Sequence, residues 1–471
     1  MPGALLQFAA FGTQSMYLMG NPQFSYFKSV YKRCSNFAME SMRQTFDTAP
    51  VIEQSTRGSF RCKIGKNGDL VKDIFFSFAL PNIYADDDTR FQWIENVGQL
   101  IVYEYSISVD NQKIDSGYGE WACIWNELTI PLSKRTTFDR MTGNVDDLKN
   151  PKANVNLYVI DNNELTNVYY PAGKAGTPSI RSRRIYFPLP FWFTKSPGLA
   201  LPLIALQYQN LYVTVELRAA DELYQLFDNT LSRYVSPTSY NRTFPSRDVS
   251  MSRFMTEPES AVKVVDTVFL DAWLEVNYIF LDNDERKHIA SQAQTDYLIE
   301  TLQRIDSTSL VEKNTIDLVL NNPVKELVWI TRRSDVYLYN DWCNYSNAYP
   351  RDDAYSIMKT ATIMFNGYAR VEEKEAAYYN LLQPFMHHTC SPREGIYCYS
   401  FALHPEKPVQ PSGSVNLSMI NSTQLYLTAN PFNVGESVIA HDKRYYEVTV
   451  YAVGYNIFRI VAGTGNLAFT T

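Results

Sequence analysis

Alternation of apolar and polar residues is the dominant pattern along this chain. Runs with a period of two residues occur at Ile74–Leu80, Tyr103–Val109, Ile185–Phe193, Leu211–Leu217 and Tyr446–Val450. Such alternation is typical of strands that bury one face in a core and leave the other face in solvent. The pattern therefore predicts β-sandwiches.

Turn residues separate the expected strands, and helical pattern is scarce. Asn67-Gly68, Asp110-Asn111 and Asn366-Gly367 each lie between two apolar runs, where a tight turn needs positive φ. Helical spacing occurs only in short candidates, namely part of Asp284–Leu302, Val371–Leu382, Glu120–Leu128 and Ala219–Leu231. We expect an all-β chain with a few short helices and long loops.

A faint internal repeat divides the chain into two halves. The matching segments are, in order, Val71–Ile74 and Val324–Leu327, the hairpins Ile107–Lys113 and Ile363–Tyr368, and the aromatic strands that start at Ile185 and Ile396. In both halves the hairpin leads into a short helical stretch. The shared order predicts two successive sandwiches built from the same sequence of elements.

Composition sets the expected boundaries of these two sandwiches. We expect an N-terminal arm at residues 1–24, a first sandwich at 25–218, a linker at 219–261 and a second sandwich at 262–471. The first sandwich carries about 45 extra residues in an insertion at about 131–182, which is rich in Asn, Asp, Pro and Gly. An insertion of this composition is expected to form a long exposed loop.

Composition also limits the function. The 471 residues are 45% hydrophobic and 14% aromatic, which is enough for large cores, and the net charge is −7. Because proteins that neutralise phosphates carry dense basic runs, direct nucleic-acid binding is not expected. Six scattered cysteines are expected to be free thiols in a reducing compartment. The first 20 residues lack a basic region and no uninterrupted apolar run reaches about 18 residues, so we expect neither a signal peptide nor a spanning helix.

Cysteine and histidine residues gather at one place without forming a familiar motif. His387-His388-x-Cys390 is followed by Cys398 and His404, but this spacing matches no common zinc arrangement. We interpret the group as structural. We therefore expect no catalytic residue, no cofactor site and no metal site.

Acidic and glycine-rich segments also carry no ligand motif. Asp86–Asp88 is interpreted as a solvated loop, since no calcium-loop spacing accompanies it. Gly173–Thr177 and Gly463–Asn466 complete no phosphate-loop pattern and are interpreted as turns. N-x-[ST] sequons, the acceptor motif for glycosylation, lie at Asn241, Asn344, Asn416 and Asn421. A chain this rich in Asn, Ser and Thr produces such sequons by chance, and a cytosolic protein does not meet the standard glycosylation machinery.

Blocks spread along the whole chain resemble one family. They are Gly12–Gln23, Phe27–Arg33 with Asn36–Ala38, Pro197–Tyr208, Tyr278–Asp282 with Glu285-Arg286, Tyr297–Glu300, Ser400–Leu403, Gln410–Gly413 and Tyr455–Ile460. In this order they resemble the major capsid proteins of nucleocytoplasmic large DNA viruses, of the chlorella-virus and iridovirus type. Pro197–Tyr208 is the most specific block. Departures from the family gather in the loops, including residues 131–182 and 218–263.

The resemblance implies a double jelly roll, in which each half is an eight-stranded β-sandwich. It implies a structural subunit of an icosahedral virus shell that assembles as a pseudo-hexagonal homotrimer and tiles the capsid facets. The implied partners are further copies of the chain, minor capsid and penton proteins, and an internal membrane near the inner face, where the arm would lie. The implied location is the virion, after assembly in the host-cell cytoplasm, and the insertion would face outward.

A different class of function remains open from the residues alone. Jelly rolls also occur in carbohydrate-binding and carbohydrate-active proteins, where exposed aromatic side chains stack on sugars. That alternative needs a carboxylate pair across a groove or a defined Ca²⁺ site. No local motif provides either, although carboxylates distant in sequence could converge.

Overall fold

Antiparallel strands form most of the chain in the computed structural model, which describes residues 3–85, 89–151, 158–161, 164–167, 178–256, 268–310, 312–349, 355–430 and 445–469. Contacts divide the chain into two units, Met1–Phe37 and Ala38–Thr471. The first unit contains two short helices, α1 (Gly3–Ala9) and α2 (Thr13–Met19), which bury no residue. It extends further than the arm expected at residues 1–24.

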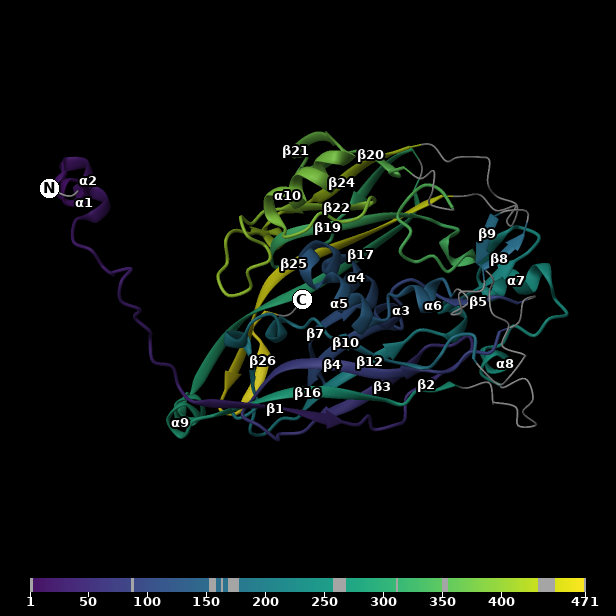
Figure 1. Ribbon diagram of the computed structural model, residues 1–471, viewed down its shortest axis with the longest axis horizontal. Helices are drawn as coiled ribbons and strands as arrows, with labels where there is room; N and C mark the ends of the chain where they lie inside the picture. Colours follow the sequence, from purple (N-terminus) through teal and green to yellow (C-terminus); the bar gives the residue numbers. More distant parts are fainter. Residues whose placement is uncertain are drawn as a thin grey trace. The chain divides into compact units, whose positions relative to one another are not determined.

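The first sandwich consists of two facing sheets (Figure 1). Sheet 1a has the order β1 (Phe37–Gln44), β16 (Ala272–Leu281), β4 (Leu70–Leu80) and β10 (Arg183–Pro188), with short β11 (Leu201–Pro202) also paired to β4. Sheet 1b has the order β3 (Gly58–Ile64), β12 (Leu211–Leu217), β6 (Val102–Val109) and β7 (Gln112–Tyr118).

The second sandwich repeats this arrangement. Sheet 2a has the order β17 (Gln294–Leu310), β25 (Tyr446–Val461), β19 (Pro323–Arg333) and β22 (Ile396–Ser400), with β23 (Val415–Asn416) and β26 (Thr464–Leu467) paired to its strands. Sheet 2b has the order β18 (Lys313–Asp317), β24 (Thr423–Ala429), β20 (Met358–Phe365) and β21 (Tyr368–Glu375).

The two sandwiches have the same topology, strand for strand. In each, the first, eighth, third and sixth main strands form one sheet, and the second, seventh, fourth and fifth form the other. This is the strand order of a jelly roll, so the expected double jelly roll is confirmed. The repeat segments that start at Val71 and Val324 lie at equivalent positions, near the beginnings of β4 and β19.

Alternation of side chains explains how each sandwich closes. Along β12 the burial alternates strictly, with Val213 and Val215 fully buried between the sheets. Aromatic side chains fill the first core, among them Phe76, Phe78 and Phe187. The second core is built around Trp329, Tyr379 and Tyr397. Burial of this much apolar surface is the main force that holds the sheets together.

Two of the three expected turns form hairpins. The prediction for Asn67-Gly68 is wrong, because neither residue has positive φ and the segment connects β3 of sheet 1b to β4 of sheet 1a. Asp110 and Asn366 adopt positive φ, at 51° and 48°, between the paired strands β6–β7 and β20–β21. Gly367 follows with φ of 83°. Short polar residues and glycine tolerate this left-handed conformation, which turns a hairpin in the direction of the strand twist.

The expected division of the chain is wrong at one strand. Residues 262–471 were assigned to the second sandwich, but β16 pairs with β4 along Ala272–Ile279 and so belongs to sheet 1a. The polar segment at 219–261 is not a linker between sandwiches, since Leu226, Tyr240 and Phe254 are buried in the first core. Polar composition suggested a boundary, whereas long-range strand pairing decides it. The second sandwich begins after α9 (Asn283–Ser291).

Two expected helices differ from the structure. Ala219–Leu231 forms a single 3₁₀ turn followed by β13 (Tyr224–Asp228), which pairs with β5 (Phe91–Trp93) and β14 (Arg233–Val235). Val371–Leu382 begins as strand β21, which ends at Glu375, and is helical from residue 376 on. In the first place the distant strand β5, and in the second the adjacent hairpin strand β20, overrides the local apolar spacing.

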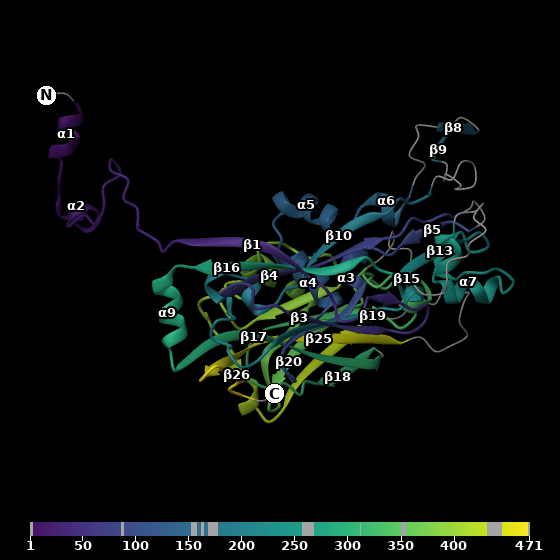
Figure 2. The same cartoon turned by 90° about the horizontal axis from the view of Figure 1, so that it is seen from below.

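The insertion at residues 131–182 is described only in part. It contains α5 (Leu132–Thr142), which lies beside β10 (Figure 2), then α6 (Asp146–Lys149) and a hairpin of β8 (Tyr158–Asp161) and β9 (Glu164–Asn167). The glycine segment Gly173–Thr177 and the acidic segment Asp86–Asp88 lie outside the described residues. Among the described helices, none is long and apolar enough to cross a membrane.

Candidate functional site: the junction between the two sandwiches

A helix of the first sandwich lies on the outer face of the second. Helix α4 (Gly119–Thr129) carries an apolar stripe at the spacing i, i+3, i+4 and i+7, formed by Trp121, Ile124, Trp125 and Leu128. This stripe packs with Val328, Ile330, Tyr345, Ile396, Cys398, Tyr451 and Val453, most of which lie on sheet 2a. The stripe and these residues form a third apolar cluster, which we call the junction core. It joins the two sandwiches.

A glycine lets α4 start close to the first sandwich. At Gly119 a Cβ atom would lie 2.1 Å from the carbonyl oxygen of Val102 and 2.3 Å from that of Gln99. Real Cβ atoms do not approach backbone oxygen this closely, so only glycine fits. The helix can therefore turn directly from the end of β7 toward sheet 2a.

A buried charge triad links the sandwiches beside the junction core. The Glu300 carboxylate accepts hydrogen bonds from the ammonium groups of Lys195, which belongs to the first sandwich, and Lys325, which belongs to the second. Lys325 also donates to the carbonyl of Pro405 at 2.7 Å. Burial and then the charge of Lys195 lower the pKa of Lys325 to about 8. Burial opposes ionisation of Glu300, but the two ammonium groups outweigh it and lower its pKa.

Arginine from the second sandwich reaches acidic side chains of the first at two further places. The Arg393 guanidinium binds Glu95 at 3.1 Å and Glu127 at 2.5 Å. Arg332 binds Glu120 on α4 at 2.8 Å. Guanidinium groups can bind two carboxylates with good geometry, which suits them to partly buried pairs. The junction core is thus flanked by three ionic links.

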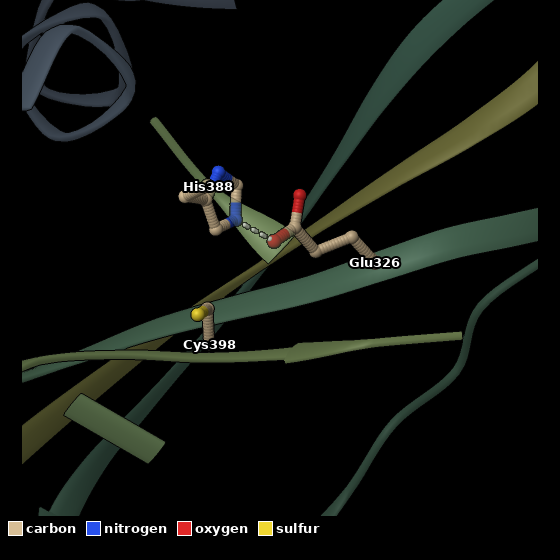
Figure 3. A group of neighbouring side chains, drawn as sticks. All are labelled: Glu326, His388 and Cys398. Carbon is tan, nitrogen blue, oxygen red and sulfur yellow. Dashed lines mark hydrogen bonds and ion pairs between the residues drawn. The ribbon is translucent and has the colours of Figure 1, made fainter. Parts of the chain in front are cut away.

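One further cluster lies under α4 at the edge of sheet 2a. Figure 3 shows His388 pointing toward Glu326, with Cys398 on the neighbouring strand. His388 Nε2 lies 2.5 Å from Glu326 Oε1, and His388 Nδ1 lies 3.0 Å from Glu406 Oε1. Burial alone would lower the pKa of His388, but the facing carboxylate of Glu326 raises it to about 12. His388 is therefore a cation between two carboxylates at neutral pH.

This cluster contains the donor types of a metal site but is arranged as an ion pair. Donor atoms of Glu326, His388 and Cys398 lie within 4.8 Å of one another. The short contact between Glu326 and His388 Nε2 uses the atoms that a metal would need, and a charged imidazole has no lone pair to offer. The geometry supports the structural interpretation of this group.

The other members of the sequence group lie apart from the cluster. His387 is half-buried and its Nδ1 lies 3.2 Å from the carbonyl of Leu403, while the Cys390 thiol donates to the carbonyl of Ile130. His404 is exposed. All six cysteines are free, as expected. Sequence reasoning missed Glu326, which is 62 residues from His388 and has a buried carboxylate in the repeat segment that opens β19.

The asparagines of the four sequons differ in solvent exposure. Asn241, Asn416 and Asn421 are exposed. Asn344 is buried, and its side-chain nitrogen donates to the carbonyl of Ala348 at 3.0 Å. Only the three exposed asparagines are accessible to a modifying enzyme in the folded chain.

His388 is expected to make the fold more stable in mild acid than in mild alkali. Its folded pKa of about 12 lies above the ordinary value of 6.5, so its contribution is complete below pH 6.5 and declines as pH rises toward 12. His388→Gln keeps a hydrogen-bond donor without the charge. The difference in unfolding free energy between the two proteins, measured in urea, should shrink from about pH 6 to about pH 8.5 by up to about 1.4 kcal/mol per pH unit. A constant difference would contradict the charged pair.

Two carboxylates that line a groove beside the junction form structural ion pairs. Glu95 and Glu127 line an open groove at the edge of the junction together with Arg135 and Arg393. A sugar-cleaving site needs one carboxyl group as an acid and the other as a base or nucleophile. Here Arg393 forms ion pairs with both carboxylates, so both take part in a structural contact. The groove therefore gives no support to the carbohydrate-active alternative.

Comparison with known proteins identifies the family. "Major capsid protein N-terminus" matches residues 25–282, and "Large eukaryotic DNA virus major capsid protein" matches residues 285–466. The major capsid protein of Pyramimonas orientalis virus is 31% identical and that of Phaeocystis pouchetii virus is 30% identical, with 100% of each chain covered in both comparisons. The protein of the "PBCV-1 virus capsid, quasi-atomic model" has a TM-score of 0.66 at 25% identity, covering 95% of this chain and 100% of that chain.

The ranges of the two family matches place the boundary between the sandwiches where the strand pairing places it. The family is structural and not enzymatic. The two matched ranges meet where β16 ends and α9 begins. The relatives are structural proteins of the virus shell and not enzymes. The junction accordingly holds two sandwiches together and carries out no reaction. The chain belongs to the major capsid proteins of large eukaryotic DNA viruses and is a structural subunit of an icosahedral capsid.

Proposed function

We propose that three copies of this chain form a pseudo-hexagonal homotrimer that tiles the facets of the capsid. The observation that carries this proposal is the identical strand order of the two sandwiches in each chain. Three copies around a threefold axis present six similar sandwiches, so the outline approaches a hexagon. A hexagonal unit can cover a flat facet with one repeated set of contacts.

The purified chain is expected to be a trimer in solution. Light scattering coupled to size exclusion should give a mass about three times the 54.1 kDa of one chain. Negative-stain images should show particles with six lobes. A monomer at every concentration tested would contradict the trimer.

We propose a division of roles among the parts of the chain. The first jelly roll extends to β16 and the second follows α9, with both held as one body by the junction. The insertion at residues 131–182 faces outward. The N-terminal unit faces inward, toward minor capsid and penton proteins and an internal membrane. Its exposed apolar side chains, among them Phe8, Tyr17 and Leu18, support a role in contact with such partners.

We further propose that the chain assembles in the host-cell cytoplasm and does not bind the genome directly. Free cysteines are consistent with a reducing compartment. A net charge of −7 is unfavourable for contact with phosphates.

A further inference from the structure

The helical segment that follows β21 leaves an apolar face in solvent. This segment consists of a π-helical turn, Tyr378–Leu382, and α10 (Gln383–His387). Leu381, Leu382, Phe385 and Met386 are 55%, 46%, 81% and 50% exposed. We call these four residues the α10 face. Four large apolar side chains side by side in water are unusual on a monomer surface and indicate a contact site.

The opposite side of the same segment is firmly anchored. Tyr379 is fully buried against Trp329 and donates to the carbonyl of Ala361 at 3.0 Å. Asn380 donates to the carbonyl of Ile396 at 2.8 Å. The segment is therefore fixed in place, and its outer face is presented without a partner from the described part of the chain.

Three residues of the α10 face hold the same positions along the chain as residues of the α4 stripe. Counted from the last residue of β7, the stripe residues of α4 are the third, sixth, seventh and tenth, namely Trp121, Ile124, Trp125 and Leu128. Counted from the last residue of β21, the same positions are Tyr378, Leu381, Leu382 and Phe385. In the first jelly roll the stripe covers a neighbouring sandwich. In the second jelly roll three of the four equivalent residues are exposed.

The surface that α4 covers also has an uncovered counterpart. Strand β19 is buried on both faces from Val324 to Thr331, because α4 lies on the outside of sheet 2a. On β4, the equivalent strand of sheet 1a, Phe75 is partly exposed. Counted from the start of the shared repeat segment, Phe75 holds the position of Val328, which lies in the junction core.

Aromatic side chains surround this uncovered position. On the strands beside β4, Tyr186 and Trp273 both pair with Ser77, two residues beyond Phe75, and Tyr186 is 40% exposed. Side chains at paired positions in adjacent strands project to the same face of a sheet. We call Phe75, Tyr186 and Trp273 the outer face of sheet 1a; Ser77 itself is fully buried.

Arginine lies beside the outer face of sheet 1a and glutamate lies beside the α10 face, each among mixed charges. The guanidinium groups of Arg43 and Arg184 lie 3.8 Å and 4.1 Å from the ring centre of Trp273, and both also pair with Asp271. Near the α10 face, Glu372, Glu373 and Glu375 are exposed on β21 together with Lys374. The junction within the chain has the same plan, with arginine on the sheet side and glutamate on the helix side.

We infer that the α10 face docks on the outer face of sheet 1a of a second copy of the chain, as α4 docks on sheet 2a within one copy. This inference rests on the proposed trimer and names its contact. Each copy has one donor surface and one acceptor surface, so the contact is head-to-tail. Three such contacts close a ring in which every sandwich receives a helix from its neighbour.

Cross-linking tests which surfaces meet. With p-benzoylphenylalanine in place of Phe385 and the rest of the chain unchanged, irradiation of the assembly should link that position to β4, β10 or β16 of another copy, as identified by mass spectrometry. Cross-links from Phe385 to any other surface would overturn the docking. This measurement does not depend on a destabilised variant.

Substitutions on the donor surface and on the acceptor surface test whether the contact is head-to-tail. Phe385→Asp on the donor surface or Tyr186→Asp on the acceptor surface should each weaken trimer formation about 30-fold or more, as expected for loss of a central contact residue. Mixed in equal amounts, the two variants should form a dimer and no trimer, because only one intact donor and one intact acceptor remain per pair. Val319→Asp, at a position that is 82% exposed outside both surfaces, is the control and should remain a trimer.

The possible outcomes distinguish a failure of the inferred docking contact from a failure of the proposed trimer. A monomeric wild-type chain would contradict the proposed trimer. A trimeric wild-type chain whose Phe385→Asp variant is equally trimeric, or whose two variants restore a full trimer when mixed, would overturn the docking and leave the trimer standing. Circular dichroism of each variant shows whether the monomer is folded, and both substituted side chains are at least partly in solvent.

Discussion

Replacing Glu300 with alanine is expected to lower the free energy of unfolding by about 3–5 kcal/mol, because it removes the carboxylate that accepts hydrogen bonds from two ammonium groups in the protein interior. The side chains of Glu300 and Lys325 are 6% and 1% exposed, and that of Lys195 is 20% exposed. Water therefore cannot replace the lost carboxylate. Urea denaturation at neutral pH, with the midpoint and slope measured for both proteins, gives the difference directly.

Two further variants show whether the loss of stability in Glu300→Ala arises because the charges are buried. Asp296→Ala removes another carboxylate of the same strand, but the Asp296–Arg459 pair is exposed, so its urea midpoint should stay close to that of the wild type. Lys195→Met, Glu300→Leu and Lys325→Met together replace the triad by apolar side chains and should recover most of the loss. A Glu300→Ala protein as stable as Asp296→Ala would contradict the importance of the triad.

The fold could be predicted where both halves of the chain carry the same short-range signals, such as turn residues. Asp110 and Asn366 mark equivalent hairpins because both halves need a left-handed turn there, and the short range of that requirement makes it visible in sequence. The segments that begin at Val71 and Val324 mark the third strand of each sandwich. Such signals were enough to predict two β-sandwiches in tandem, whereas the jelly-roll order of their strands was implied by the family resemblance.

The boundary and the junction could not be predicted because they depend on contacts between distant residues. The sequence of β16 predicts a strand that would fit either sandwich. Only its pairing with β4 shows that it belongs to the first sandwich. Glu300 is 105 residues from Lys195, and Arg393 is 266 residues from Glu127. A charged residue on a strand normally suggests a solvated face. Only the packing of α4 shows that these charges are partners.

The junction would allow one chain to act as two adjacent sixths of the proposed ring. Two jelly rolls on a flexible linker would sample many angles, and each angle would place the α10 face differently. The apolar stripe of α4 and the three ionic links fix one angle. An apolar centre supplies most of the free energy, while buried ion pairs restrict the register in which the two surfaces can meet.

Truncation of Trp125 to alanine is expected to loosen this junction strongly. Its indole is stacked on Trp121 with 5.5 Å between ring centres, and Lys195 lies 5.0 Å from its ring. Removing a buried indole costs about 3–5 kcal/mol, since the surrounding side chains cannot fill the cavity. Leu132→Ala is the control, at a position 82% exposed on α5, and should change stability by no more than about 0.5 kcal/mol.

Thiol labelling can show where the loosening occurs. Cys398 lies in the junction core beneath α4, whereas Cys62 lies in the core of the first sandwich, and both are almost fully buried. Burial raises the pKa of Cys398 to about 11 and that of Cys62 to about 12, so both react slowly in the wild type. In Trp125→Ala the labelling of Cys398 should accelerate while that of Cys62 stays slow. Equal acceleration at both cysteines would mean that the whole chain unfolds together, and no acceleration would mean that α4 is not what closes the junction.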